Sequence, residues 1–238
     1  MIEQIDIGDI SVEVEFKDIK NIHLSVYPPT GRVRIAAPER MDLDTIRLYA
    51  ISKIKWIKKN QKNFQNQERE TPREYLNLES HYVWGQRYLL KVIEKEKVPG
   101  VEITHKNMIL TVRSGTDQEK RESIISAWYR DELRDKAAPL FEKWENILKV
   151  KPNKIIVRWM KTKWGSCNPK TGNILLNTEL AKKPIIFLEY IILHELVHLL
   201  EPHHNANFVS LMDRYMPHWK HIRDELNRAP LGHVDWEY

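Results

Sequence analysis

The stretch Ile191–Leu200, which reads IILHELVHLL, is the most informative part of the chain. Three polar residues, His194, Glu195 and His198, interrupt an otherwise apolar run in it. Apolar residues on nearly every side of a helix are typical of a helix buried in a protein core. We therefore predict a buried helix here, beginning at Pro184, a residue that suits the first turn.

The HELVH sequence within this helix has the spacing of a metal site. His194 and His198 lie four residues apart, so their side chains leave the same face one turn apart. Two such imidazoles can bind one tetrahedral ion, with Glu195 within reach of a metal-bound water. The pattern also arises by chance, but burying these groups without a partner would be costly. We predict one Zn²⁺ ion, with Glu195 as the catalytic base.

A catalytic zinc site uses three protein ligands and leaves a fourth position open. His204 lies six residues after His198, a spacing that other HExxH enzymes use. Those enzymes have a glycine where this chain has Glu201, so the turn must be built differently. The spacing favours His204 as the third ligand, and His203 and Glu225 remain alternatives.

Composition sets the broad class of protein. The chain of 238 residues is long enough for one large domain or two small ones. No apolar run reaches the roughly 18–20 residues of a membrane span, so we expect no membrane partner. The first residues lack the basic start of a secretory signal, and Cys167 is the only cysteine, which excludes an internal disulfide. We expect a cytoplasmic protein.

The order of the predicted elements indicates an α+β fold. Residues 1–75 predict an N-terminal module, with an antiparallel β-meander over residues 2–38 and a helix over Asp42–Phe64. Residues 65–73, QNQERETPR, are polar and unpatterned, and they predict a linker. Residues 76–113 predict a second β-rich segment of four short strands.

Residues 114–238 predict the part that carries the chemistry. Thr116 and Glu119 match a capping box, which predicts a long helix from there to about Val150. The elements predicted after it are strands at 155–160 and 174–177 joined by 161–172, a helix at 184–200, and a helix at 206–227 interrupted at Pro217.

Four segments in this last part follow one another in a recognisable order: RWMKTKWGSC at 158–167, GNILLN at 172–177, HELVH at 194–198 and HNANF at 204–208. With the N-terminal β-hairpin and the Lys53-x-x-Trp56-Ile57 helix, they resemble the YgjP-like metallopeptidases, relatives of the SprT and WLM zinc peptidases. The resemblance covers most of the chain. It implies a minimal zincin-like metallopeptidase domain preceded by a small β-rich N-terminal module. It also implies that the third ligand is His204, four residues before Phe208.

The resemblance further implies that the GNILLN strand lies along the substrate cleft. Asn173–Asn177 is short and has polar ends, which suit an exposed edge to which an extended peptide could add. The candidate substrate contacts are Arg158, Trp164, Gly165, Ser166, Asn173 and Tyr215.

Several of these candidates compete with simpler interpretations. Gly165 can bring backbone close to the site, whereas Trp164 is better explained by packing. Cys167 would need an activating base to act as a nucleophile, and a small buried apolar residue is the simpler interpretation. Tyr215 and His218 are candidates for the electrophilic partner found in many zincins.

Three functions fit these motifs, and the first is a zinc metallopeptidase that acts on a peptide or protein. The second is a metal-dependent nucleotide phosphohydrolase, which Arg158, Lys161 and Lys163 would suit. Such enzymes often pair two metals through carboxylates, and no second carboxylate cluster lies near the motif. The third is a DNA-associated peptidase, in which the lysines of Ser52–Lys62 follow a phosphate backbone. A helix with one buried face also exposes lysines, and a net charge of +5 does not indicate nucleic acid by itself.

Overall fold

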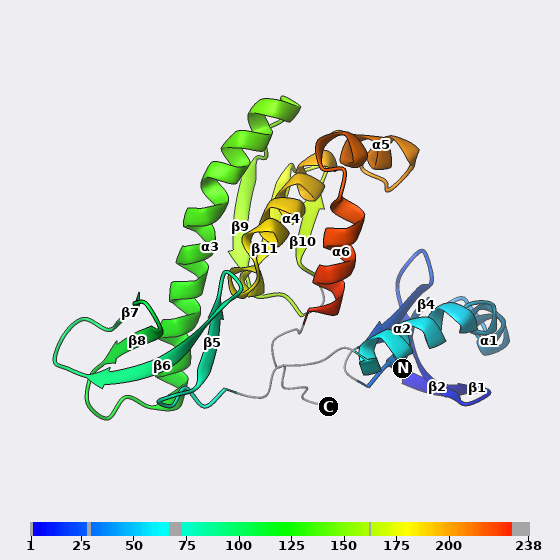
Figure 1. Cartoon of the computed structure of the whole chain (residues 1–238). Helices are drawn as coiled ribbons and strands as arrows, with labels where there is room; N and C mark the ends of the chain where they lie inside the picture. Colours follow the sequence, from blue (N-terminus) through cyan, green and yellow to red (C-terminus); the bar gives the residue numbers. More distant parts are fainter. Residues whose placement is uncertain (1, 28–29, 67–72, 162, 230–238) are drawn as a thin grey trace. The chain divides into compact units, whose positions relative to one another are not determined.

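The computed structural model describes residues 2–27, 30–66, 73–161 and 163–229. The chain forms two compact units, Met1–Glu68 and Arg69–Tyr238, each with its own hydrophobic core (Figure 1). Most of the predicted linker at residues 65–73 lies outside the described residues. Among the described helices, none combines the length and apolar character of a membrane span.

The first unit contains a four-stranded sheet of β1 (Ile2–Ile7), β2 (Ile10–Lys17), β3 (His23–Tyr27) and β4 (Arg32–Pro38). The strand order is β1-β2-β4-β3, and β2 pairs with β4 in parallel. The predicted antiparallel meander is therefore wrong. The two central strands supply the fully buried residues Val12, Val14, Val33 and Ile35, whereas β3 is at most half-buried. The most apolar strands thus occupy the centre of the sheet.

Two helices pack on this sheet where one was predicted. Asp42 caps α1 (Leu43–Ser52) by accepting a hydrogen bond from the Thr45 backbone N–H. Lys53 is the C-cap of this helix, and α2 (Ile54–Asn66) follows directly. Buried apolar residues continue at helical spacing through the break, so the periodicity by itself does not reveal it.

The second unit begins with a sheet of the same topology. It contains β5 (Ser80–Val83), β6 (Gln86–Glu94), β7 (Gly100–Ile103) and β8 (Asn107–Val112), in the order β5-β6-β8-β7 with β6 and β8 parallel. The tip of the β5–β6 hairpin is bound to the remainder of the unit. The Trp84 backbone N–H donates to the Ala181 carbonyl at 2.8 Å, and a Cβ on Gly85 would lie 2.8 Å from Pro184. This sheet is therefore anchored next to the start of the HELVH helix.

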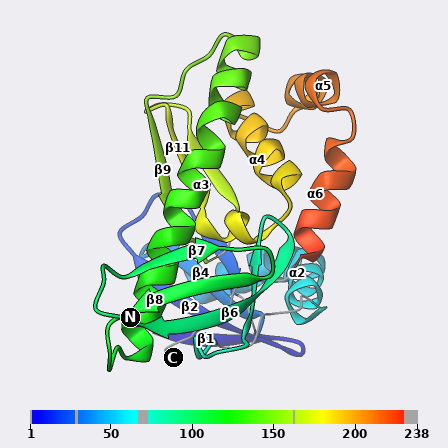
Figure 2. The same cartoon turned by 60° about the vertical axis from the view of Figure 1, so that its left-hand side comes forward.

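The elements that follow form the part with the candidate chemistry. They are α3 (Gln118–Leu148), β9 (Lys154–Arg158), β10 (Gly165–Asn168), β11 (Asn173–Asn177), the 3₁₀ helix η1 (Thr178–Lys182), α4 (Ile185–Val197), α5 (Ala206–Tyr215) and α6 (Trp219–Arg228). Helix α4 packs against α3, α5, α6 and strands β10 and β11 (Figures 1 and 2). The predicted interruption at Pro217 is confirmed, because it separates α5 from α6. The mixed α+β class is also confirmed.

The predicted edge strand lies at the centre of its sheet. The order is β10-β11-β9, so β11, which contains the GNILLN residues, has neighbours on both sides. The edge beside it is β10, GSCN, a strand that the sequence analysis assigned to a connection. Its residues carry little apolar character, and pairing with β11 rather than its own pattern makes it a strand.

Helix α3 begins one residue later than the capping box predicted. Asp117 is its N-cap and accepts a hydrogen bond from the Lys120 backbone N–H at 2.8 Å. The Thr116 hydroxyl instead donates to the Arg113 carbonyl at 2.6 Å. A carboxylate at the N-terminus also interacts favourably with the helix dipole, which favours Asp117 over Thr116.

This capping predicts the outcome of a stability measurement. Asp117→Ala should lower the free energy of unfolding by about 1 kcal/mol, because it removes the cap. Glu119→Ala, which would break a capping box, should change it by less than about 0.5 kcal/mol. Urea denaturation of both variants checks this assignment, and a larger loss for Glu119→Ala would contradict it.

Candidate metal centre

Three histidine side chains converge at the end of α4. His194 and His198 project from the helix, and His204 comes from the turn before α5. One ring nitrogen from each lies within 4.8 Å of the other two, and His194 Nε2 and His204 Nε2 are 3.1 Å apart. Ligands at about 2.0–2.1 Å from a tetrahedral ion lie roughly 3.3 Å apart. The cluster therefore fits a single tetrahedral ion.

Two neighbours orient these rings. The Glu201 carbonyl lies 3.1 Å from His198 Nδ1, so this nitrogen can donate to it and Nε2 is left to bind a cation. Phe208 packs against all three imidazoles, with ring centroids 4.6–5.0 Å away. The turn that the sequence left unexplained at Glu201 thus serves to orient His198.

The alternative third ligands lie elsewhere. His203 is not part of the cluster, and Glu225 instead contacts His221 on its own helix at 3.3 Å. Of the three candidates that the sequence left open, the turn brings His204 to the other two histidines.

Burial tunes His194 for cation binding. It lowers the pKa of His194 to about 3, and the nearby His198 and His204 add to the effect. Burial also lowers the pKa of His198. At neutral pH these imidazoles are uncharged, which is the form that binds a metal.

Glu195 lies beside the cluster in a nearly dry environment, with 5% of its surface exposed. Burial raises its pKa to about 8, while the Lys163 charge and a hydrogen bond from the Cys167 backbone N–H act in the opposite direction. A carboxyl group with a pKa near neutrality is suited to accept and return a proton. A cation held by the histidines would further favour its charged form.

Gly165 allows strand β10 to approach this carboxylate. A Cβ at this position would lie 2.7 Å from Glu195 Oε1 and 2.7 Å from Ile191 Cγ2. Any side chain would therefore displace the helix, the strand or the carboxylate. The expectation that Gly165 brings backbone close to the site agrees with this geometry.

Asn177 is a residue that the sequence analysis did not single out. It is 1% exposed, and its side-chain amide donates to the Met160 carbonyl at 2.8 Å and the Lys163 carbonyl at 2.7 Å. Its backbone N–H donates to the Trp164 carbonyl at 2.9 Å. Asn177 therefore fixes the segment that leads into Gly165. A polar residue that ends an apolar strand was the available signal.

The other predicted site residues are dispersed. Trp164 is half-buried against the core, and Arg158 and Ser166 line a separate cavity. Gly165 pairs with Leu176 near one end of β11. Asn173 lies at the other end of this strand and contacts Asn153. Tyr215 packs edge-on against Trp144. The Cys167 thiol is half-buried, and burial raises its pKa to about 11, which disfavours a nucleophile.

A different tyrosine adjoins the cluster. Tyr190, one turn before His194 on α4, has its ring 5.7 Å from that imidazole and stacks on Trp219. Burial raises its pKa to about 12, so it stays protonated at neutral pH. The four-residue spacing on the helix could have revealed it.

The sequence matches the family described as YgjP-like, metallopeptidase domain, over residues 20–229. The chain belongs to the YgjP-like metallopeptidase family. No curated protein matches it.

Similar solved structures include two metallopeptidase zymogens. One is abylysin of Pyrococcus abyssi, with 24% identity, a TM-score of 0.36 and coverage of 38% of this chain and 90% of that one. The other is jannalysin of Methanocaldococcus jannaschii, with 24% identity, a TM-score of 0.35 and coverage of 38% and 86%.

The contact at Gly165 predicts a selective loss of activity. Gly165→Ala should lower kcat for peptide hydrolysis by about 10- to 100-fold, because a Cβ would displace Glu195 from its position. Metal content, measured by elemental analysis, should stay unchanged. Gly100→Ala is the control, since nothing lies within 4 Å of a Cβ there. Full activity in Gly165→Ala would show that the close approach is dispensable.

The buried carboxyl predicts a pH-dependent stability of the metal-free YgjP-like protein. The pKa of Glu195 is about 8 in the folded chain and 4.5 when unperturbed. Between these values only the unfolded state loses the proton, so folding is progressively destabilised as pH rises. Glu195→Gln should therefore stabilise the metal-free protein at pH 8 by a few kcal/mol, and by almost nothing near pH 4. Denaturant melts across this range check it; a constant difference would contradict the raised pKa.

Proposed function

We propose that this protein is a zinc-dependent peptidase that holds one ion with His194, His198 and His204. The observation that carries the proposal is the convergence of three imidazoles beside a buried carboxylate, in a chain that belongs to a metallopeptidase family. When bound, zinc lowers the pKa of a coordinated water toward about 7 and polarises the bond to be cleaved.

Glu195 is the proposed general base. Its carboxylate is held by the Cys167 backbone N–H and bounded by Gly165, so its position beside the histidines is fixed before substrate arrives. It would take a proton from the attacking water and return one to the leaving amine. Burial contributes here because it brings the proton affinity of the carboxyl group close to the working pH.

Strand β10, rather than β11, is the proposed docking edge for substrate. In an antiparallel pair, successive residues direct their backbone N–H and C=O groups alternately toward the partner strand and away from it. The hydrogen bond from Asn177 to Trp164 shows that Trp164 directs its backbone toward β11. Gly165 and Cys167 therefore direct their backbone groups away from β11 and toward the edge beside Glu195. An extended peptide could add there as a further strand, with its scissile bond next to the metal.

The competing functions have less support. Within the described residues, the three histidines are the only group of three or more candidate metal ligands that meet, so a second metal has no comparable site. For nucleic-acid association, Lys58 on α2 pairs with Asp9 at 2.8 Å and Lys53 lies over the Tyr49 ring. Since Ile57 of the same helix is fully buried, exposed lysines follow from its amphipathic pattern, and DNA association stays a prediction.

Metal analysis of single variants tests the proposed ligands. His204→Ala should lower zinc affinity by more than about 100-fold, because losing a ligand costs more than losing an outer partner. His203→Ala, one residue away, should retain the metal and serves as the control. Competition with a chromophoric chelator measures both affinities. Equal affinity in the two variants would exclude His204 as a ligand.

Hydrolysis in a base-deficient variant tests the chemistry. Glu195→Gln should keep its zinc, yet cleave an unstructured protein such as casein about 100- to 10,000-fold more slowly than the wild type. Release of phosphate from nucleotides should not be detected in either protein. Peptide cleavage that survives in Glu195→Gln, or phosphate release that depends on Glu195, would contradict the proposed peptidase.

A further inference from the structure

Two adjoining cavities of the second unit share Trp159 and Lys161 in their walls. The first, of about 440 Å³, is enclosed by α3, η1, β5 and the segment before β5. The second, of about 420 Å³, lies over Leu175 and Ser166 of the three-stranded sheet. Neither contains a candidate metal ligand of the histidine cluster.

The walls of both cavities are basic. The cationic lining residues, which we name the basic track, are Arg73, Arg130, Arg158, Lys161, Lys163 and Lys182. Only two carboxylates, Glu122 and Glu179, line the cavities with them. The lining thus has four more cations than carboxylates, in a chain of net charge +5, and one of these cations, Arg73, also pairs with Glu79 at 3.6 Å. Anionic groups would therefore be attracted to this surface over most others.

One of the two carboxylates forms an ion pair with one of the six cations. Glu179 is 6% exposed and pairs with the Lys182 ammonium at 2.8 and 2.9 Å. Arg130, by contrast, makes no hydrogen bond or ion pair with any residue that the structure describes, and it is exposed at the mouth of the larger cavity. A positive group of this kind can pair with an incoming anion without breaking an existing contact.

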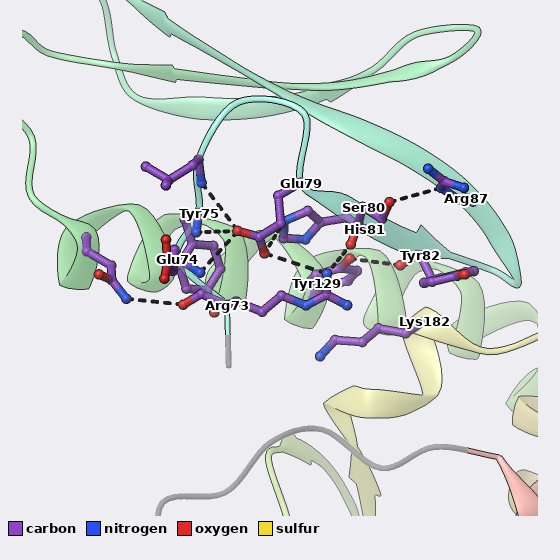
Figure 3. A network of polar contacts seen from close by, with 12 residues as sticks. Arg73, Glu74, Tyr75, Glu79, Ser80, His81, Tyr82, Arg87, Tyr129 and Lys182 are labelled. Atoms are coloured by element: carbon purple, nitrogen blue, oxygen red, sulfur yellow. Dashed lines mark hydrogen bonds and ion pairs between the residues drawn. The ribbon is translucent and has the colours of Figure 1, made fainter. Parts of the chain in front are cut away.

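A network of polar contacts holds the wall that carries Arg73 (Figure 3). Glu79 Oε2 accepts hydrogen bonds from the backbone N–H groups of Glu74, Tyr75 and Leu76 at 2.6–3.3 Å. Tyr75 and Leu78 have positive φ angles of 56° and 69°. Such angles cost about 1 kcal/mol or more in residues other than glycine, and strain of this kind gathers at functional sites.

The basic track leads to the proposed docking strand. Ser166 lines the smaller cavity and follows Gly165 on β10, where Gly165 adjoins Glu195. Because neighbouring side chains of a strand point to opposite faces, the smaller cavity lies on the face of β10 away from Glu195. Lys163 and Ser166, which flank Gly165 in the chain, bring this cavity to the strand at which substrate would dock.

We propose that the two cavities bind acidic side chains of a peptide substrate that extends from the metal centre along the basic track. This specificity rests on the proposed peptidase function. Glutamate or aspartate residues spaced along an extended chain match cations that are spread over two cavities. Tyr75 and Tyr82 can pack against the intervening side chains.

The cavities fit a polyphosphate less well. No glycine lines either one, so they lack the flexible backbone loop that cradles adjacent phosphates. Glu122 and Glu179 would also repel a continuous run of negative charge. A peptide with neutral residues between its carboxylates avoids this repulsion.

Binding without turnover tests the site. A fluorescent ten-residue peptide with three spaced glutamates, and its counterpart with glutamines, are titrated into zinc-loaded Glu195→Gln protein while anisotropy is recorded. The acidic peptide should bind about five-fold tighter, and the difference should shrink at high salt. Adding Arg130→Gln and Lys161→Gln to the Glu195→Gln protein should abolish this difference in affinity. The matched control, Lys106→Gln with Lys136→Gln, removes the same charge from exposed positions outside the cavities and should preserve it.

Each result bears on the proposal. Equal affinity for the two peptides, or an equal loss in the control pair, would overturn it. Displacement of the acidic peptide by a single-stranded oligonucleotide that binds tighter at the same residues would overturn it in favour of nucleic acid. Unchanged binding of the glutamine peptide and an unchanged melting temperature show that the variants remain folded. An acidic preference in a protein that hydrolyses no peptide would contradict the proposed peptidase function and leave the binding site standing.

Discussion

Burial of α4 on nearly all sides is the constraint on which the second unit depends. The helix carries two imidazoles and a carboxyl group into a core formed by α3, the sheet and the C-terminal helices. Each of these polar groups loses water there and needs a partner. The fold meets this need by bringing His204 back from the following turn and by directing the Cys167 backbone N–H at Glu195. The same burial sets the protonation of these groups, because it keeps His194 neutral and raises the pKa of Glu195.

The site is therefore as much a property of strand β10 as of the helix. Gly165 permits close approach, and Asn177 fixes the preceding segment through hydrogen bonds to two of its carbonyl groups. Asn177 is itself positioned by β11, which pairs with both of its neighbours. A central strand thus positions an edge strand, and the edge strand positions the proposed base. This order explains why a short strand of little apolar character is ordered beside the candidate metal centre.

The basic track extends the same unit beyond the metal centre. Its residues come from α3, η1, the end of β9, the segment after β9 and the segment before β5. The β5–β6 hairpin is bound to Ala181 and Pro184 next to the start of α4. The β-rich segment and the helix that bears the histidines are consequently one body with a shared core.

The sequence by itself determined the local features. The spacing of His194 and His198, the apolar helix around them, the interruption at Pro217 and the α+β class all depend on nearest neighbours along the chain, which patterns report directly. Non-local features required the tertiary structure. Parallel pairing of β2 with β4, the central place of β11, the existence of β10 and the role of Asn177 depend on which strands meet, and strand pairing leaves little trace in a short segment. The basic track is the clearest case, since its six cations are spread from Arg73 to Lys182 and only folding gathers them.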